Sequence, residues 1–203
     1  MVRVAEIWCL RHGESSNVVA GQSGALPDAA LTRTGRAQAV AAAATLATLG
    51  RRPTRVYAST AVRAMQTADL LVSGLSLREP LIPLNGLVEV CLGRGEGHTG
   101  APIQAEAAQV LHTWVVGGGL DARVADGENG HEVVARMTSA LHTIAADNKD
   151  GVVALVGHVA SLTAGLSALC GLGAEVWGRP LPHAVPFRID TDGSTWRCHE
   201  WPG

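Results

Sequence analysis

The sequence predicts an α/β fold: a three-layer α/β/α sandwich in which helices cover both faces of a mostly parallel central sheet. Short apolar runs suited to buried strands alternate with longer segments suited to helices, and this pattern is the main support for the prediction. The composition agrees, because 47% of the 203 residues are hydrophobic and 17% are charged. A chain of this length builds one sizeable core, so we expect a single domain over residues 1–203.

Apolar runs predict the strands. They lie at residues 3–10, 55–58, 81–84 and 151–157, and residues 185–190 and 196–201 form a predicted hairpin across Asp192-Gly193. The first and fourth runs are nearly continuous in apolar residues, as is typical of parallel strands buried on both faces.

Helical patterns fill the segments between these strands. The predicted helices cover residues 31–50, 59–74, 105–119, 129–148 and 160–171. Thr32 is the expected N-cap of the first helix and Gly50 its C′ residue. Ser59 or Thr60 is the expected cap of the second.

Composition also argues against several classes of function. The net charge of −2 lacks the basic surplus of a nucleic-acid-binding protein, and no apolar segment reaches the roughly 18 residues of a membrane span. Residues 1–10 are too short for a secretory signal, so we expect a cytoplasmic protein with neither nucleic acid nor membrane as a partner. The cysteines show no CxxC pair, and no Cys/His pair has the spacing of metal ligands, so we expect reduced thiols and no metal site. The four cysteines are Cys9, Cys91, Cys170 and Cys198.

Two predicted strands end on a histidine, and this repetition points to a functional site. Arg11 and His12 follow the first apolar run, and His158 follows the run at 151–157. Ligands of open α/β sheets bind beyond the carboxyl ends of the strands. If the two strands are neighbours, both imidazoles face the same crevice.

The residue types at this place favour chemistry at phosphorus. A neutral imidazole is a nucleophile near pH 7, and an arginine offers a planar fork of donors that matches a phosphoryl group. We expect Gly13 to let the backbone approach a ligand closely. Acyl transfer is not supported, because the chain has no GxSxG elbow, and Walker and dinucleotide-binding glycine loops are absent too.

Six motifs, in order along nearly the whole chain, resemble those of the histidine phosphatase superfamily, the phosphoglycerate mutase-like enzymes. LRHGES at 10–15 resembles the family signature, LTRTGRAQA at 31–39 a helix start, and YASTAVRAMQTA at 57–68 the second arginine motif. LVEVCLGRGEG at 87–97 resembles the acidic segment, DGENGHEVVARM at 126–137 the segment after it, and LVGHVASL at 155–162 the second-histidine motif. The resemblance implies a phosphoglycerate mutase-like fold.

The resemblance also implies roles for single residues. His12 is the expected nucleophile and forms a phosphohistidine, while Arg11, Arg63 and His158 surround the phosphoryl oxygens. Glu89 is the expected proton donor to the leaving oxygen and then the base that activates water.

Two other carboxylates compete with Glu89 for the acid–base role. Glu14 is closer to His12 in the sequence, but its position in the family usually orients the nucleophilic histidine or its loop. Glu128 resembles a glutamate that supports the site. We therefore favour Glu89.

Substrate contacts are expected from variable segments at 18–30 and 94–126. The residues we assign to substrate binding are Asn17, Gln22, Ser23, Glu14, Arg94, His98 and Val159. Members of the family usually have an asparagine six residues after the nucleophile, whereas Asn17 follows His12 by five. His98 and His183 lie in predicted loops that are able to approach the crevice, whereas His112, His131 and His142 are expected on helices, outside it.

The resemblance favours a compact, metal-independent phosphatase without a cofactor, acting on a small phosphorylated metabolite. A phosphoglycerate-type mutase is the first alternative, but the mutase branch generally carries an inserted segment that this chain lacks. A phosphoester-binding protein without turnover is the second, and the retained site residues speak against it. The sequence leaves the oligomeric state open, with a homodimer as one alternative.

Overall fold

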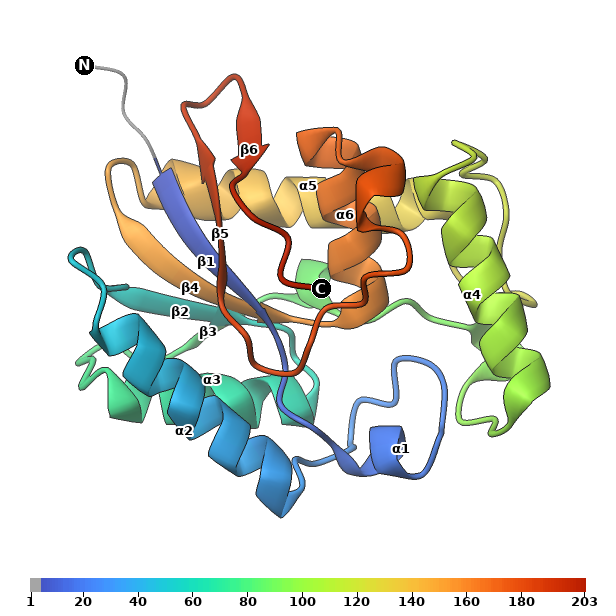
Figure 1. Cartoon of the computed structure of the whole chain (residues 1–203), viewed down its shortest axis with the longest axis horizontal. Helices are drawn as coiled ribbons and strands as arrows, with labels where there is room; N and C mark the ends of the chain where they lie inside the picture. The colour runs from blue at the N-terminus through green and yellow to red at the C-terminus, as the bar shows by residue number, and fades with distance from the viewer. Residues whose placement is uncertain (1–4) are drawn as a thin grey trace.

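A six-stranded sheet lies at the centre of the computed structural model, which describes residues 5–203 (Figure 1). The strands are β1 (Ala5–Arg11), β2 (Arg55–Ala58), β3 (Ile82–Pro83), β4 (Val152–Gly157), β5 (Phe187–Thr191) and β6 (Trp196–Cys198). Their order in the sheet is β3-β2-β4-β1-β5-β6. The first four strands in this order are parallel, whereas β5 and β6 are antiparallel to their neighbours. The mostly parallel sheet is therefore confirmed.

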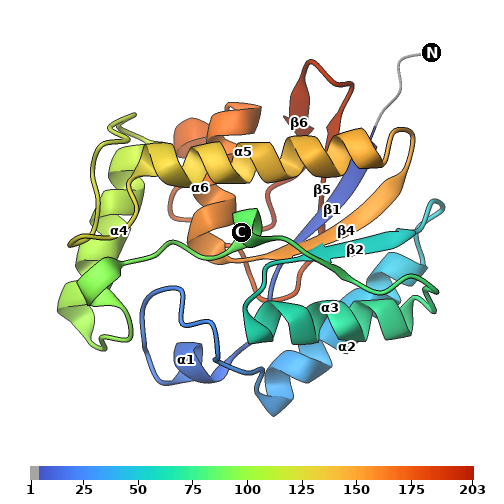
Figure 2. The ribbon, with the colours of Figure 1, turned by 180° about the vertical axis from the view of Figure 1, so that it is seen from behind.

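Helices cover both faces of the sheet, and Figures 1 and 2 show the layers from opposite sides. The helices are α1 (Ser16–Val19), α2 (Arg33–Ala47), α3 (Val62–Gly74), α4 (Ala101–Val115), α5 (Gly130–Asp147) and α6 (Val159–Cys170). Short 3-10 turns lie at η1 (Asn85–Leu87), η2 (Gly93–Gly95) and η3 (Gly173–Val176). Helices α2 and α3 pack on one face and α5 and α6 on the other, while α4 packs against α6.

Side chains along each strand point alternately to the two faces of the sheet, and they build one hydrophobic core on each face. Ile7 and Cys9 of β1 face the larger core under α5 and α6, whereas Leu10 faces the smaller core under α2 and α3. The smaller core is rich in alanine, which lets α2 and α3 approach the sheet closely. Each fully buried leucine or isoleucine contributes about 1.5–3 kcal/mol relative to the exposed side chain. The two cores thus fix the sheet from both sides.

The central strands place the ends of β1 and β4 beside each other. The two strands are parallel and directly adjacent, with Arg11 opposite Gly157 in the register. The residues that follow them, His12 and His158, therefore emerge at the same edge of the sheet. This is the arrangement that the two histidine-ended runs predicted.

Several helix and strand boundaries differ from the sequence prediction. Helix α2 begins after its predicted cap Thr32, whose hydroxyl accepts a hydrogen bond from Gly35 N. It ends at Ala47 with Thr48 as its C-cap, so the predicted C′ role of Gly50 is wrong. Helix α4 begins at Ala101, four residues earlier than predicted, with a proline in its first turn. The hairpin strands are shorter than predicted, and of the predicted strand 3–10, residues 3 and 4 lie outside the described residues.

Helix α3 is not capped by a side chain. Its N-cap is Ala61, so the prediction that Ser59 or Thr60 occupies this position is wrong. The Ser59 hydroxyl accepts a hydrogen bond from Ala61 N at 3.3 Å and also contacts His158. The serine is thus engaged with the second histidine.

In the part of the chain from residue 5 onward, none of the helices combines the length and the apolar character needed to cross a membrane.

Candidate active site

The two strand-end histidines lie in contact. The backbone N–H of His12 donates to the carbonyl of Gly157 at 3.0 Å, which continues the β1–β4 ladder by one residue. The ring centroids of His12 and His158 are 5.0 Å apart in an edge-to-face arrangement. Both side chains are almost fully buried.

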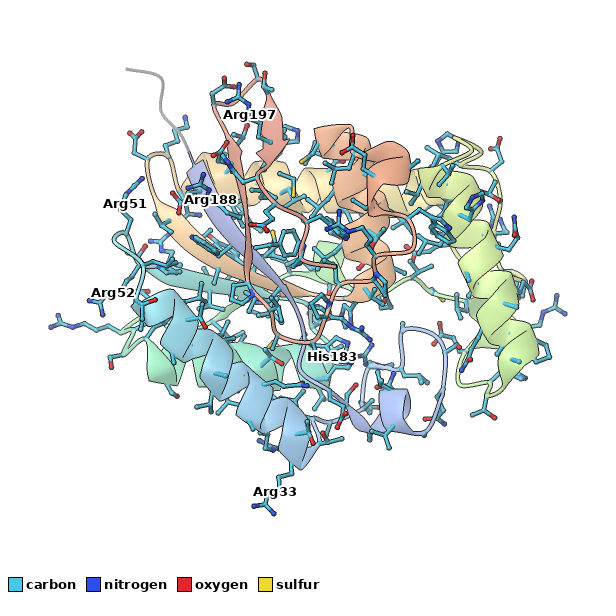
Figure 3. The ribbon with its side chains drawn as sticks, in the orientation of Figure 1. Arg33, Arg51, Arg52, His183, Arg188 and Arg197 are labelled. Carbon is cyan, nitrogen blue, oxygen red and sulfur yellow. The ribbon has the colours of Figure 1, made fainter. Side chains whose placement is uncertain are left out.

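A third histidine supports the end of β1 from the β5 side. Ala184 N donates to the carbonyl of Arg11 at 2.9 Å, and Nδ1 of His183 lies 2.9 Å from the carbonyl of His12. The His183 ring lies 5.6 Å from that of His12, and Figure 3 shows it near the carboxyl end of β1. Of the two loop histidines expected to approach the crevice, His183 does so. Its contact is with the backbone carbonyl of His12.

Gly13 permits a close crossing of two backbone segments. A Cβ atom at Gly13 would meet the carbonyl of Gly35 in the first turn of α2, and one at Gly35 would meet the carbonyl of Glu14. Neither glycine therefore tolerates a side chain. The expectation that Gly13 makes room for a ligand is wrong, because the space beside it is filled by α2.

Hydrogen bonds set the orientation of the His12 ring. Its Nδ1 lies 2.7 Å from the carbonyl of Gly13, which only a protonated Nδ1 satisfies. Its Nε2 accepts from Nε of Arg63 at 3.2 Å. Burial lowers the pKa of His12 well below its usual value, and the positive charge of Arg63 lowers it further. The ring is therefore neutral near pH 7, with the Nε2 lone pair directed at a cation.

Arg63 is held rigidly in the first turn of α3. Its Nη1 and Nη2 donate to the carbonyls of Leu26 and Ala25 at 2.6 and 2.7 Å. The same two residues donate their N–H groups to the carboxylate of Glu96, which also accepts from Leu92 N at 2.7 Å. Glu96 thus positions the loop that positions Arg63, and the sequence analysis assigned it no role. Burial lowers the pKa of Arg63, while the carboxylates of Glu89 and Glu96 raise it.

Two buried nitrogen atoms beside His12 have no partner within residues 5–203. They are Nδ1 of His158 and Nε of Arg11. His158 Nε2 lies 2.7 Å from the Ser59 hydroxyl, and Arg11 Nη1 donates to Leu181 O at 3.1 Å. Burial, followed by the neighbouring His12 and Arg63, lowers the pKa of His158 well below its usual value. This favours a neutral, hydrogen-bonding His158 over a cationic one.

Glu89 lies across the cavity from His12, at the start of α6. Its Oε1 accepts from Val90 N at 2.9 Å and from Ser161 N at 2.8 Å, and its Oε2 accepts from Ala160 N at 3.2 Å. The N-terminus of a helix stabilises a negative charge at this position. Three backbone N–H groups thereby orient the carboxylate.

Glu128 supports the segment that carries Glu89. Arg136 donates to both carboxylate oxygens of Glu128, at 2.7 and 3.0 Å, and to the carbonyls of Gly86, Val88 and Glu89. Glu128 also accepts from Cys91 N at 2.9 Å. The pair is part of the scaffold behind Glu89.

A cavity of about 200 Å³ connects these groups. Its lining residues are Arg11, His12, Asn17, Val18, Gln22, Ser23, Gly24, Arg63, Glu89, Val90, Leu92, Ala107, Val159 and Ala160. His158 lies beneath it, in contact with His12.

Four of the predicted substrate-binding residues line this cavity and three do not. Asn17 is buried in α1, and its Oδ1 accepts from the Ser15 hydroxyl at 2.7 Å, so it reaches the cavity despite the shorter spacing. Gln22, Ser23 and Val159 are the other three lining residues. Glu14 accepts from the Thr32 hydroxyl at 2.6 Å and ties the loop to α2.

Arg94 and His98 are the other two predicted substrate-binding residues that do not line the cavity. Arg94 is 83% exposed and lies 3.5 Å from Asp126, and His98 is exposed, so neither side chain forms part of the wall.

Other histidines and possible metal ligands lie apart from this site. His112 packs edge-to-face with Trp177, and His142 with Trp196. Among the residues from 5 to 203, no group of three or more His, Cys, Asp or Glu side chains is arranged to hold a metal ion.

The buried neutral imidazoles predict how stability depends on pH. The pKa values of His12 and His158 are lowered in the folded state, whereas both return to about 6.5 on unfolding. Below that pH the unfolded chain binds more protons than the folded chain. The stability that the two neutral imidazoles contribute is therefore complete above pH 6.5 and is lost as the pH falls. We expect the free energy of unfolding to decrease by about 1 kcal/mol per imidazole between pH 7 and 5.5.

Urea denaturation at a series of pH values measures this effect. A His158→Gln variant lacks one of the two imidazoles and should lose about half of the pH-dependent change. Equal pH slopes for the variant and the wild type contradict the assignment.

Comparison with known proteins agrees with the site. The pattern of the histidine phosphatase superfamily (branch 1) matches residues 7–202. Glucosyl-3-phosphoglycerate phosphatase of Mycobacterium tuberculosis (strain H37Rv) is 31% identical over 98% of this chain and 95% of its own. The structure of a mycobacterial glucosyl-3-phosphoglycerate phosphatase in complex with VO3 superimposes with a TM-score of 0.80 at 27% identity, covering 97% of this chain and 98% of that one. A protein of Proteus mirabilis named probable phosphoglycerate mutase GpmB is 27% identical over 97% of this chain and 89% of its own. The chain therefore belongs to the histidine phosphatase superfamily, with the phosphoglycerate mutase-like fold that its motifs predicted.

Proposed function

We propose that this protein is a phosphomonoesterase that hydrolyses a small phosphorylated metabolite through a phosphohistidine on His12. One observation carries the proposal: a neutral imidazole nitrogen faces a cavity that also holds two arginines and one carboxylate. The two relatives named phosphatases support hydrolysis as the outcome.

In the first step His12 Nε2 attacks the phosphorus atom of the ester. The P–N bond forms as the P–O bond to the leaving alcohol breaks, and Glu89 gives its proton to the leaving oxygen. Arg63 leaves the Nε2 lone pair and donates to the phosphoryl oxygens. The unpaired Arg11 Nε and His158 Nδ1 supply further donors. Fixed donors of this kind stabilise the charge on the transferring group.

Ser59 gives His158 the tautomer that this step requires. A neutral His158 donates from Nδ1 only when Nε2 accepts, and the Ser59 hydroxyl is positioned to donate to Nε2. Ser59 is held in turn by Ala61 N. The residue expected to cap a helix thus acts in the site through the second histidine.

In the second step water replaces His12 at phosphorus. Glu89, now ionised, takes a proton from the water as the P–O bond forms and the P–N bond breaks. Inorganic phosphate leaves and His12 returns to its neutral state. Glu89 therefore acts as an acid and then as a base.

Hydrolysis is favoured over a mutase reaction because the cavity is small and open to water. The chain between Glu89 and His158 forms η2, α4, α5 and β4 with their connections, without a further inserted helix or strand. A mutase has to protect its phosphohistidine from water, and no additional element covers the cavity among residues 5–203. The Proteus mirabilis relative is named a probable phosphoglycerate mutase, so a mutase reaction is the second candidate.

The same proposal places the reaction in the cytoplasm. All four cysteines are free thiols, as expected for a reducing compartment. The substrate is a phosphorylated small molecule, as the names of the phosphatase relatives suggest.

Phosphate release tests the reaction type. Purified protein is mixed with phosphorylated metabolites, in buffer with and without a chelator, and both inorganic phosphate and exchange between glycerate positions are measured. We expect release without exchange, unchanged by the chelator. Fast exchange without net release would establish the mutase, and loss of activity with the chelator would overturn the metal-independent mechanism.

Glu96→Gln is expected to lower kcat/KM by about 10- to 100-fold. The amide keeps the size of the side chain but loses charge-assisted hydrogen bonds to Ala25 N and Leu92 N, each contributing about 1.5–3 kcal/mol. The loop that holds Arg63 then loosens, so the affinity for inorganic phosphate falls as well. Kinetics and phosphate titration measure both effects.

Asp126→Asn is a matched control, since Asp126 accepts from Arg94 N in the neighbouring loop, outside the cavity. An unchanged phosphate affinity in Glu96→Gln contradicts the role of Glu96 in positioning Arg63.

A further inference from the structure

The wall of the cavity beyond His12 carries no positive charge. On one side it consists of Asn17, Val18, Gln22 and Ser23, which are neutral. On the other side Leu92, Ala107 and Val159 are apolar. Among residues 5–203, Arg11 and Arg63 are the only cations that line the cavity, and both lie at the phosphoryl end beside His12.

Cations near the cavity are engaged elsewhere. Arg94 turns outward toward Asp126, Arg136 is bound by Glu128, and Arg123 donates to the carbonyl of Gly127 at 3.1 Å. The arginines labelled in Figure 3 lie on α2, on the α2–β2 connection and on the β5–β6 hairpin, and none of them lines the cavity. No cation is thus available for a second anionic group of the substrate.

The two lining arginines are fully used by the phosphoryl group and the backbone. Arg63 already donates to Leu26 O and Ala25 O, and its Nε donates to His12. Arg11 donates to Leu181 O and keeps Nε for the phosphoryl oxygens. An unpaired carboxylate in such a site costs several kcal/mol in desolvation.

We propose that the leaving group of the substrate is neutral: a small hydroxylated alcohol, such as a sugar or polyol, without a carboxylate or second phosphate. This inference rests on the proposed function. The amide of Gln22 and the hydroxyl of Ser23 suit the hydroxyl groups of such an alcohol, and the apolar side suits its carbon skeleton. The size agrees, because a cavity of about 200 Å³ is smaller than the roughly 300 Å³ at which ordinary ligand sites begin.

The proposal separates this protein from the relatives whose name denotes a phosphoglycerate ester, since glycerate is a carboxylate. The difference lies in the wall of the cavity, and the phosphoryl chemistry is unaffected by it.

A matched pair of esters tests the charge of the leaving group. Glycerol 3-phosphate and 3-phosphoglycerate share a three-carbon skeleton and differ in a hydroxymethyl group against a carboxylate. We expect kcat/KM to be at least about tenfold higher for glycerol 3-phosphate, because the binding site pairs no cation with the carboxylate. p-Nitrophenyl phosphate is measured in parallel as a reference for the chemistry.

A cation placed in the wall should reverse this preference. Gln22 is exposed at the rim, so Gln22→Arg preserves the fold and is expected to raise the relative kcat/KM for 3-phosphoglycerate by about tenfold. Gln109→Arg adds the same charge on the outer side of α4, away from the cavity, and is expected to leave the ratio unchanged.

The outcomes distinguish the two proposals. Hydrolysis of 3-phosphoglycerate as fast as or faster than that of glycerol 3-phosphate overturns the neutral leaving group and leaves the phosphatase in place. A failure of all three esters to release phosphate or to label His12 overturns the proposed function and this inference with it.

Discussion

Replacing His12 with alanine is expected to reduce phosphate release by at least about 10⁴-fold, because the atom that accepts the phosphoryl group is removed. The remaining donors of Arg11, Arg63 and His158 continue to bind phosphate, so substrate affinity should change far less than turnover. The phosphoenzyme is measured directly: mixing with a labelled phosphoester and quenching in base should leave acid-labile, base-stable label on the wild type and none on the variant.

Two further variants keep this experiment decisive. His12→Asn retains a polar side chain beside the Gly13 carbonyl and guards against a loss of fold in the alanine variant. His131→Ala removes an exposed histidine on α5 and is expected to retain full labelling. Label that persists in both His12 variants places the phosphohistidine on another residue, and His158 and His183 are then the candidates by proximity.

Glu89→Gln is expected to lower kcat for alkyl phosphates by about 10²–10⁴-fold, the usual contribution of a general acid and base. p-Nitrophenyl phosphate has a leaving group that needs little protonation, so its first step should survive in the variant. The second step still needs a base to activate water. We therefore expect a burst of one nitrophenolate per active site followed by slow turnover, with label accumulating on His12.

The other two carboxylates near the site are the natural controls. Glu14 is bonded to Thr32 and Glu128 to Arg136, so neither is free to meet a leaving oxygen. Glu14→Gln and Glu128→Gln should weaken turnover of both kinds of ester equally, by loosening the scaffold. A burst in either of these variants, and none in Glu89→Gln, would falsify the assignment of the acid.

The sheet could be predicted from the sequence because its strands carry their own signal. The run that became β4 is apolar throughout, and the run that became β1 is interrupted between Ala5 and Leu10 by Glu6 alone. Each run is followed by a charged or polar residue, so both the presence of the strand and its end could be predicted. The ends of helices are harder to predict from the sequence, because they depend on hydrogen-bond partners that are distant in the sequence. The start of α3 illustrates this point: Ser59 has the right chemistry for a cap, but its hydroxyl is used by His158, 99 residues away.

Some of the residues that meet at the site could also be predicted from the sequence. The two strand ends pointed to His12 and His158, and the resemblance to the family's motifs added Arg63 and Glu89; the structure brings all four together. Glu96 was missed because it acts through hydrogen bonds accepted from backbone N–H groups, two of them in a loop some 70 residues earlier, which no side-chain pattern reveals. Arg94 and His98 were expected in the wall because they belong to a variable segment.

The positions of Arg94 and His98 follow from how that segment folds. Leu92 and Gly95 are buried, whereas Arg94 and His98 are exposed. Neighbouring residues of an irregular loop therefore face opposite directions, and only the folded backbone decides which of them reaches the cavity.

The pairing of β1 with strands on both sides has a consequence for how the site opens. The amide of His12 donates to Gly157 of β4, and the amide of Ala184, before β5, donates to the carbonyl of Arg11. We expect hydrogen exchange at either amide to require the centre of the sheet to separate. The loop over residues 18–30 lies outside the sheet and is held by bonds to Glu96 and Arg63 and by backbone bonds to Val62, Gly97 and His98. We expect it to open at a lower free energy than the sheet. We therefore expect the backbone amides at the phosphoryl end of the cavity to exchange only through global unfolding. The amides of the loop over residues 18–30, at the leaving-group end, should exchange through local fluctuations.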